Sequence, residues 1–377
     1  MPIDIYLRRL DFRLIFLINL LMLISLLVIS SAAQPIGYGE EFHFFTPMVQ
    51  RQLFFFVLGW GCFFFLSYMD YRTLRKQSPL IYFGILLLLA GLFFTDPIQN
   101  VRRWYKLPLI NFALQPSEYA KLALVIALSF FLEKNKDHIH QNRTIVQTAI
   151  LVMIPFALIL KQPDLGTSLV LLPITYVMLY FGGAPRKVLF MMGLGGVTML
   201  AFVVSMFVGF ISHDEFKPIA LKFIKEYQYE RLNPDTYHQK SAQIAIALGS
   251  LTGSGWGESE YTAKRWLPFA DTDSVFPAFT EQFGLLGAFV LLASFFFLVY
   301  ISFQVTAVAK DVFGRLLSAG IAVYLGIHVI VNVGMMCGLL PITGVPLLLI
   351  SYGGSSVMSA MIALGILQSI YVRRYMY

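Results

Sequence analysis

Long apolar runs recur along the chain and are separated by short polar segments. A transmembrane helix needs roughly 20 predominantly apolar residues to cross the hydrocarbon core of a bilayer. Ten runs approach that length, at residues 12–33, 52–69, 79–95, 119–133, 145–160, 166–183, 188–212, 284–304, 312–337 and 345–370. We therefore predict an all-α polytopic membrane protein with about ten transmembrane helices, which form a single domain over residues 1–377.

The composition excludes a soluble protein. Hydrophobic residues make up 58% of the chain and charged residues only 13%, whereas a soluble domain carries about 25% charged residues. Cys62 and Cys337 both lie in apolar runs, so a disulfide framework is not expected. The first run, 12–33, is longer than the apolar region of a secretory signal peptide, which favours a retained helix.

The distribution of Lys and Arg predicts the orientation. With the N-terminus inside, the inner segments hold many more basic residues than the short outer segments, as cytoplasmic loops do. Both termini are therefore predicted to be cytoplasmic. The formal net charge of +7 has the same explanation, so no nucleic-acid partner is expected. The long segment 213–283, between the seventh and eighth spans, lies outside, and we expect it to contain short helices at the membrane surface.

Ionisable residues at membrane depth are costly and usually face a partner or a cavity. The first such place is 115–118 with Lys121. Glu118 and Lys121 are three residues apart on one helix face, which fits either a structural ion pair or a functional cavity. The second place is the short turn 161–166, where Asp164 could cap the next helix, pair with Lys121 or meet a ligand cation.

Three acids, Asp271, Asp273 and Glu281, follow one another closely before the eighth span. A carboxylate at the rim of an apolar bundle could act as a general base. The three acids could instead hold a divalent cation, or they could simply be solvated.

Prolines and glycines interrupt the last apolar runs, at 341–346 and 351–356. They could permit close helix packing or mark a broken helix that lines a cavity. Composition and spacing thus place polar groups near the outer surface, but they do not decide between catalysis and transport.

In this order, the motifs resemble the signature of the SEDS family of bacterial cell-wall proteins, and its RodA-type members in particular. The resemblance extends from the first helix to the last, and the family architecture also has ten helices with a large outer loop. The motifs are Arg103-Trp104, Gln115-Pro116-Ser117-Glu118, Gln162-Pro163-Asp164-Leu165-Gly166, Tyr237-His238, Leu267-Pro268, Thr272-Asp273, Asn332-x-Gly334-Met335, Gly338-Leu339-Leu340-Pro341-x-Thr343-Gly344 and Ser351-Tyr352-Gly353-Gly354-Ser355-Ser356.

The resemblance implies a peptidoglycan glycosyltransferase of the bacterial cytoplasmic (inner) membrane, which polymerises lipid II during cell elongation and cell-shape maintenance. The implied partners are a class B penicillin-binding protein, which supplies the transpeptidase, and other membrane proteins of the elongation complex. Asp273 aligns with the acid of the family's His-Thr-Asp-Phe motif, the family's candidate for catalysis. Asp271 and Ser274 replace the His and Phe of that motif, and Gln282 replaces the second acid of a Glu-Glu pair.

Glycosyl transfer needs a base for the acceptor hydroxyl and positive charge for the departing pyrophosphate. We assign Asp273 as the base, with Asp271 and Glu281 as candidate ligands of a divalent cation, Mg²⁺ or Mn²⁺. Substrate contacts are expected from Trp104, Arg102, Arg103, Glu118, Lys121, Asp164 and Lys240, with Arg231 as a further cation. The alternatives are a lipid II flippase, which would need polar residues through the bilayer depth, and a scaffold of the cell-wall machinery.

Overall fold

The computed structural model describes residues 2–33, 43–97, 101–107, 112–211 and 235–375, with isolated positions between 212 and 234. Ten long helices of these residues form a bundle: α2 (Phe12–Ala32), α3 (Pro47–Tyr68), α4 (Arg72–Gly91), α5 (Pro116–Lys134), α6 (Asn142–Lys161), α7 (Leu165–Phe181), α8 (Arg186–Phe207), α13 (Val275–Val308), α14 (Val312–Met336) and α15 (Gly354–Val372). The shorter elements are α1 (Ile3–Arg8), η1 (Leu92–Phe94), η2 (Lys136–His138), β1 (Tyr105–Leu107), β2 (Phe112–Leu114), α11 (Tyr237–Leu248) and α12 (Glu260–Ala263).

The predicted all-α polytopic fold is confirmed, and each of the ten predicted spans corresponds to one of the ten long helices. Eight helices of the described residues are long and apolar enough to cross a membrane by length and composition. α7 is shorter, at 17 residues. α5 carries Glu118, Lys121, Glu133 and Lys134 among its 19 residues.

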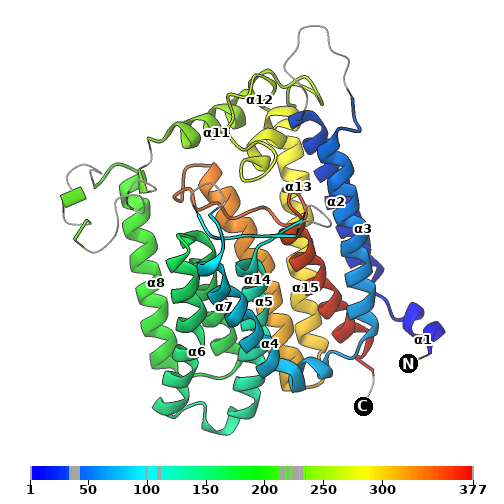
Figure 1. The fold of residues 1–377 in the computed structure, drawn as a ribbon, viewed down its shortest axis with the longest axis vertical. Coiled ribbons are helices and arrows are strands. Elements are labelled where there is room, and N and C mark those ends of the chain that lie inside the picture. The colour runs from blue at the N-terminus through cyan, green and yellow to red at the C-terminus, as the bar shows by residue number, and fades with distance from the viewer. Residues whose placement is uncertain are drawn as a thin grey trace.

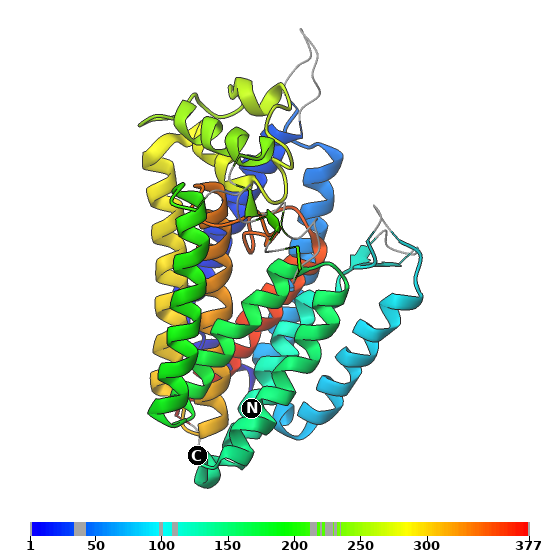
Figure 2. The same ribbon diagram turned by 90° about the vertical axis from the view of Figure 1, so that its left-hand side faces the viewer.

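Helices α5, α14 and α15 form the interior of the bundle (Figure 1). α15 packs along α3, while α14 packs against α13, α5 and α7. α8 stands at the edge of the bundle, in front of the other helices in Figure 2, where it packs mainly on α7. Met206 is its one fully buried residue, and about half of the others are exposed. Such a helix is stable only against lipid or a partner, because its exposed face is apolar.

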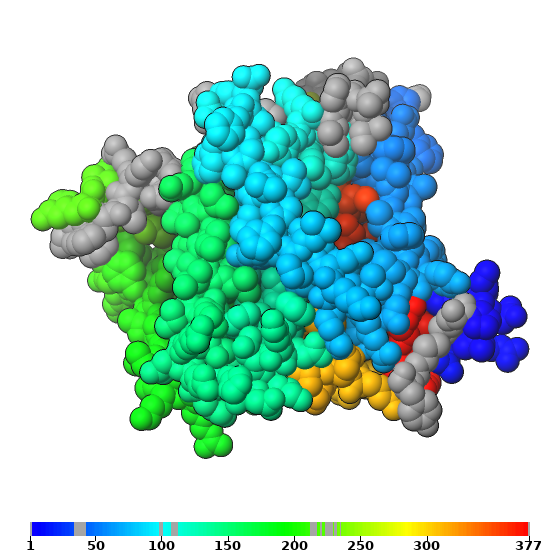
Figure 3. All heavy atoms as spheres, turned by 60° about the horizontal axis from the view of Figure 1, so that its bottom comes forward, coloured from blue at the N-terminus to red at the C-terminus, as the bar shows by residue number. Residues whose placement is uncertain are grey.

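Both chain ends lie at one end of the bundle, and α11 and α12 lie at the other (Figure 1). Figure 3 turns the end of the bundle that carries the termini toward the viewer. This end shows α1 (dark blue), the α13–α14 turn (orange) and the end of α15 (red). Termini that lie on the same side of a membrane require an even number of spans, and the ten predicted spans meet this requirement.

The predicted start of the eighth span at residue 284 coincides with a break inside α13 at Gly284 (φ 62°, ψ −164°), where two helical segments meet. The first segment, which begins at Val275, is a short helical stretch within the predicted outer loop 213–283. A Cβ at Gly284 would lie 2.4 Å from the backbone nitrogen of Gly253, so only glycine lets the preceding loop close against the break.

The last predicted span, 345–370, begins only at Gly354, because the segment before it is not helical. Pro341 and Pro346 in that segment lack the N–H that a helix needs. The helix is therefore broken in this region, as one interpretation expected, and Gly354 packs closely on Phe112, as the other expected. The sequence also gave no sign of the antiparallel pair β1–β2, which pairs Tyr105 with Leu114 and precedes α5.

Candidate functional site

The four polar places in the sequence meet at the end of the bundle that carries α11 and α12. The backbone nitrogen of Gln115 donates to Ser355 Oγ at 3.0 Å, which joins the start of α5 to the start of α15. Gln115 Nε2 and Ser117 Oγ each donate to Asp164 Oδ2 at 3.3 Å. A single polar network therefore connects α5, the α6–α7 turn and α15.

Asp164 has the capping role that its position predicts. It is the N-cap of α7, and its Oδ1 accepts from the backbone nitrogen of Thr167 at 3.4 Å. Among the described residues, Arg103 is the cation within 4 Å of Asp164: its Nη1 lies 3.9 Å from Asp164 Oδ1, and its Nε donates to the Gln162 carbonyl. Among the described residues Asp164 and Lys121 form no direct ion pair, although their charges still interact.

Lys121 and Glu118 form the predicted ion pair, with Lys121 Nζ 2.8 Å from Glu118 Oε1. Both side chains are almost fully buried. Lys121 Nζ also lies 2.7 Å from His328 Nε2 and 5.4 Å from the centre of the Tyr324 ring. Lys121 has no exposed surface, so in this structure it contacts only buried groups of the protein. Its predicted substrate contact stays a prediction.

His328 was missed by the sequence reasoning. It lies on α14 and is completely buried. A lone histidine in an apolar run has no diagnostic spacing, but its place within a predicted span was a usable signal, since ionisable residues there usually have a partner.

Asp273 lies in a turn whose backbone is held at three consecutive residues. The carbonyl of Asp271 accepts from the backbone nitrogen of Tyr352 at 2.8 Å. The carbonyl of Thr272 accepts from Ser351 Oγ at 2.7 Å, and that of Asp273 accepts from Asn332 Nδ2 at 3.0 Å. The turn is thus fixed by α14 and by the irregular segment before α15.

The irregular segment also connects Asp273 with the α6–α7 turn. The Gly166 backbone packs so closely on Thr343 that a Cβ there would lie 2.5 Å from the Thr343 carbonyl oxygen. At the next residue, a Cβ on Gly344 would lie 3.4 Å from Asp273 Oδ2. The half-buried carboxylate of Asp273 therefore faces Gly344, one residue from the contact of the segment with Gly166.

Asp271 lies in this turn and His238 lies beside it, and burial shifts the pKa of both side chains. Burial raises the pKa of the Asp271 carboxyl, and a bond from its own backbone nitrogen opposes the shift. Burial lowers the pKa of His238. His238 Nε2 lies 2.7 Å from Ser274 Oγ, so the serine that replaces the family's phenylalanine joins α11 to the turn.

Glu281 has a structural role. Its Oε1 accepts from the backbone nitrogen of Tyr261 at 2.8 Å, and its Oε2 accepts from the backbone nitrogen and hydroxyl of Thr262. In the described part of the chain, no three His, Cys, Asp or Glu side chains gather at metal-binding spacing. This donor set does not fit a divalent cation, and the assignment of Asp271 and Glu281 to a metal stays an unsupported prediction.

The remaining predicted contacts lie around the same end. Trp104 Nε1 donates to Gln115 Oε1 at 3.2 Å, and Arg102 is exposed. Lys240 lies on α11 and forms a solvent-exposed ion pair with Asp235 at 2.9 Å. Arg231 falls outside the described residues.

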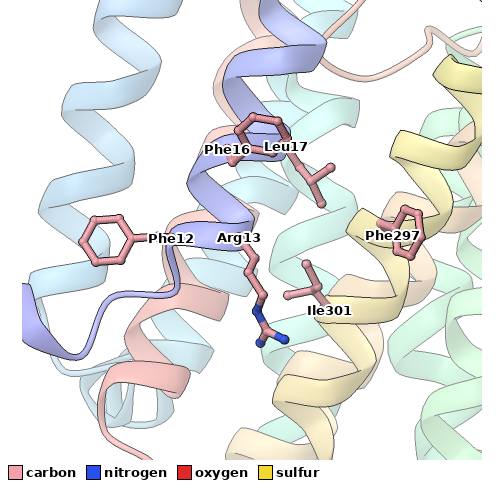
Figure 4. A pocket seen from close by; sticks show the side chains of 6 residues that line it. All are labelled: Phe12, Arg13, Phe16, Leu17, Phe297 and Ile301. Atoms are coloured by element: carbon pink, nitrogen blue, oxygen red, sulfur yellow. The ribbon is translucent and has the colours of Figure 1, made fainter.

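A separate groove of about 480 Å³ opens between α2 and α13 at the end with the termini (Figure 4). Its lining is apolar apart from Arg13, which is paired with Asp11 at 2.8 Å. The lining residues are Phe12, Arg13, Phe16, Leu17, Phe297 and Ile301. The groove lacks the acids and hydrogen-bonding groups that a catalytic site needs, so we place the functional site at the other end, around Asp273.

The arrangement around Asp273 has the parts of an acid–base site. A half-buried carboxylate stands on a backbone that is fixed at three points, and cationic side chains lie at the same end of the bundle. A fixed carboxylate can take a proton from a bound hydroxyl, and nearby guanidinium groups can stabilise an anion.

Comparisons with known proteins show the family of the chain. A family model described as cell cycle protein, named after FtsW, RodA and SpoVE, matches residues 11–376. A probable peptidoglycan glycosyltransferase FtsW of Trichlorobacter lovleyi is 32% identical over 94% of this chain and 92% of its own length. The peptidoglycan glycosyltransferase MrdB of Escherichia coli K12 is 30% identical over 96% of this chain and 93% of its own.

Two solved structures are similar over nearly the whole chain. One is a chain of a peptidoglycan synthase complex that coordinates polymerization and crosslinking; it has a TM-score of 0.77 and 28% identity over 98% of this chain and 99% of its own. The other is the rod shape determining protein RodA of Thermus thermophilus, with a TM-score of 0.70 and 27% identity over 98% of each chain.

Proposed function

Because the chain belongs to the FtsW/RodA/SpoVE family, also known as SEDS, we propose that it is a peptidoglycan glycosyltransferase that polymerises lipid II into glycan strands. The observation that carries the proposal is the convergence of four distant polar motifs around Asp273, at the end of an apolar bundle. Lipid II combines an apolar tail with a sugar-pyrophosphate head, so its polymerase needs polar chemistry at one membrane face.

In the proposed reaction, Asp273 accepts the proton of the acceptor sugar's 4-hydroxyl. The oxygen then forms a bond to C1 of the donor sugar as the bond from C1 to the pyrophosphate breaks. The undecaprenyl pyrophosphate leaves with the bonding electron pair. Arg102 and Arg103 are our candidates to stabilise the leaving anion, because both lie outside the buried interior of the bundle at the proposed outer end.

Transport of lipid II is the competing function. The buried charges of Glu118 and Lys121 could serve a transport path. However, Lys121 is five residues into α5, about 8 Å along its axis. A second charged cluster, in which Arg75 contacts Glu133 and Asp311, lies at the opposite end of the bundle. The charged clusters of the described residues thus gather at the two ends, which favours a transferase.

The activity test uses the purified full chain in detergent with fluorescently labelled lipid II. Detergent micelles have no compartments, so strand formation can only be chemistry. We expect strands that a muramidase digests. If lipid II stays monomeric although the protein is folded and binds it, the transferase proposal fails and transport becomes the better account.

We further propose that the enzyme acts in cell elongation, with a class B penicillin-binding protein and other elongation-complex proteins as partners. The structural similarity to RodA and to a chain of a peptidoglycan synthase complex supports this role, while the sequence identities are divided between FtsW and MrdB. Expression in cells depleted of either their elongation or their division glycosyltransferase tests the role. Rescue of rod shape is expected, and rescue of division alone would contradict it.

We propose cytoplasmic termini in the bacterial inner membrane. Single cysteines at the exposed positions Thr73 and Asp235 test this orientation in a chain whose Cys62 and Cys337 have been replaced. An impermeant thiol reagent added to intact cells should label position 235 and leave position 73 unlabelled. The reverse pattern would overturn the orientation.

A further inference from the structure

His328 connects two parts of the molecule that the reaction uses. Its Nδ1 lies 3.0 Å from the carbonyl oxygen of Pro346, and its Nε2 lies 2.7 Å from Lys121 Nζ. A carbonyl oxygen can only accept, so Nδ1 must carry the proton that it donates. In the neutral ring Nε2 then has a free lone pair, which accepts from Lys121. Both ring nitrogens are therefore committed to fixed partners.

The Pro346 end of this connection leads to Asp273. His328 and Asn332 are four residues apart on α14, so they lie on one helix face a turn apart. Asn332 Nδ2 donates to the carbonyl of Val345 at 2.8 Å and to that of Asp273 at 3.0 Å. His328 and Asn332 thus bond the consecutive carbonyls of Pro346 and Val345 in the irregular segment. Asn332 also bonds the carbonyl of Asp273, the proposed base.

The Lys121 end of the connection leads to α5. Lys121 is fully buried and its ammonium contacts Glu118 at 2.8 Å. The second oxygen of Glu118 is also buried and has no hydrogen-bond partner among the described residues. The position of this ion pair in the bundle therefore depends on the contacts of Lys121 with other helices. His328 Nε2, on α14, makes such a polar contact with Lys121 Nζ.

We propose that His328 is a positioning residue for glycosyl transfer: it couples the buried Lys121–Glu118 pair to the segment that fixes Asp273. The inference rests on the proposed function. His328 does not touch the substrate, and it acts through Pro346 and its neighbour Val345. The competing account is a core histidine that only stabilises the bundle.

Two substitutions separate the two halves of the coupling. In His328→Asn, the side-chain amide lies near the place of Nδ1, so it can keep the Pro346 bond but does not reach Lys121. In His328→Gln, the amide reaches the place of Nε2, so it can keep the Lys121 bond and loses the Pro346 bond. Ser318→Ala is the matched control, because Ser318 is a buried polar residue of α14 that bonds only its own helix.

The kinetic test measures kcat and KM for labelled lipid II with each purified variant, beside a thermal unfolding curve. A small misplacement of a reacting group can cost about 100-fold in rate. We expect kcat to fall about 10- to 100-fold in both His328 variants, with KM and the melting temperature nearly unchanged and the control unaffected. Wild-type kcat in either variant, or a loss that merely follows the folded fraction, would overturn the proposal.

Hydrogen exchange gives a reading that does not depend on activity. If His328 couples the segment to α5, both variants should exchange faster in peptides that cover 341–352 and 267–274, with no change in α2. A rise across the whole bundle, or no rise in these peptides, would overturn the coupling. If the wild-type chain makes no strands, the proposed function fails by itself, and the exchange data still decide whether the coupling exists.

Discussion

Asn332 holds Asp273 through the backbone: its Nδ2 donates to the Asp273 carbonyl at 3.0 Å and, with the same nitrogen, to the Val345 carbonyl at 2.8 Å. The proposed base, which lies in a turn before α13, is thus held by a side chain of α14. This relationship makes the position of the carboxylate depend on residues that never meet the substrate.

Replacement of Asn332 by alanine removes both bonds and frees the Asp273 turn. We expect kcat for lipid II polymerisation to fall about 10- to 100-fold, because the base loses its fixed position. Steady-state kinetics and a melting curve of the purified variant measure the effect. A folded variant that retains the wild-type kcat would show that the Ser351 and Tyr352 contacts suffice.

Lys121 and Glu118 should behave as a buried pair. Lys121→Met leaves the Glu118 charge uncompensated, and loss of one partner of such a pair costs about 3–5 kcal/mol of stability. The double change Lys121→Met with Glu118→Gln should recover most of the loss. Chemical unfolding in detergent measures the cycle, with Lys264→Met in the exposed pair with Glu260 as a control of little effect. Additive losses in the double variant would argue against direct pairing.

Gly166 should tolerate no side chain. An alanine Cβ would meet the Thr343 carbonyl at 2.5 Å and push the irregular segment away from α7. Overpacking of this kind costs about 1–3 kcal/mol, and polymerisation should fall with the displaced segment. The matched control is Gly196→Ala on α8, where a Cβ meets nothing within 4 Å. Equal activity of the two variants would contradict the close contact.

Asp271 should make stability depend on pH. Burial raises its folded-state pKa above the unfolded value of about 3.9. The favourable contribution of the protonated form is therefore complete below that value and is lost as the pH rises through the folded pKa. Asp271→Asn cannot ionise, so it should melt higher than wild type at pH 7, and the difference should shrink towards pH 4. A variant that melts lower at pH 7 would show that the charged form is stabilised. Its loss of polymerisation should be mild, because Asp271 is not the proposed base.

The apolar pattern predicted most of the fold, because the bilayer requires a minimum run for each helix. The apolar run predicted the part of α13 after the Gly284 break, but not the helical segment from Val275 to Phe283, because Pro277, Glu281 and Gln282 interrupt the apolar pattern there. The start of α15 escaped it because residues 345–350 are apolar and buried without being helical.

The sequence predicted which residues belong to the candidate site better than it predicted which residues contact one another. Motif order located Asp164, Glu118, Lys121 and Asp273, and spacing predicted the Glu118–Lys121 pair, whereas contacts with other elements depend on tertiary packing that spacing does not contain. Only the structure brings Arg103 to Asp164 and His328 to Lys121.

The central claim is that the chain polymerises lipid II with Asp273 as the general base. Its most direct test compares the initial polymerisation rate of purified wild type with that of Asp273→Asn, which keeps the size of the side chain but cannot accept a proton at neutral pH. A positioned acid–base group contributes about 10²- to 10⁴-fold to rate. We predict a loss of that order in a variant that remains folded and still binds its transpeptidase partner. A near-wild-type rate for folded Asp273→Asn would contradict the account and place the base elsewhere.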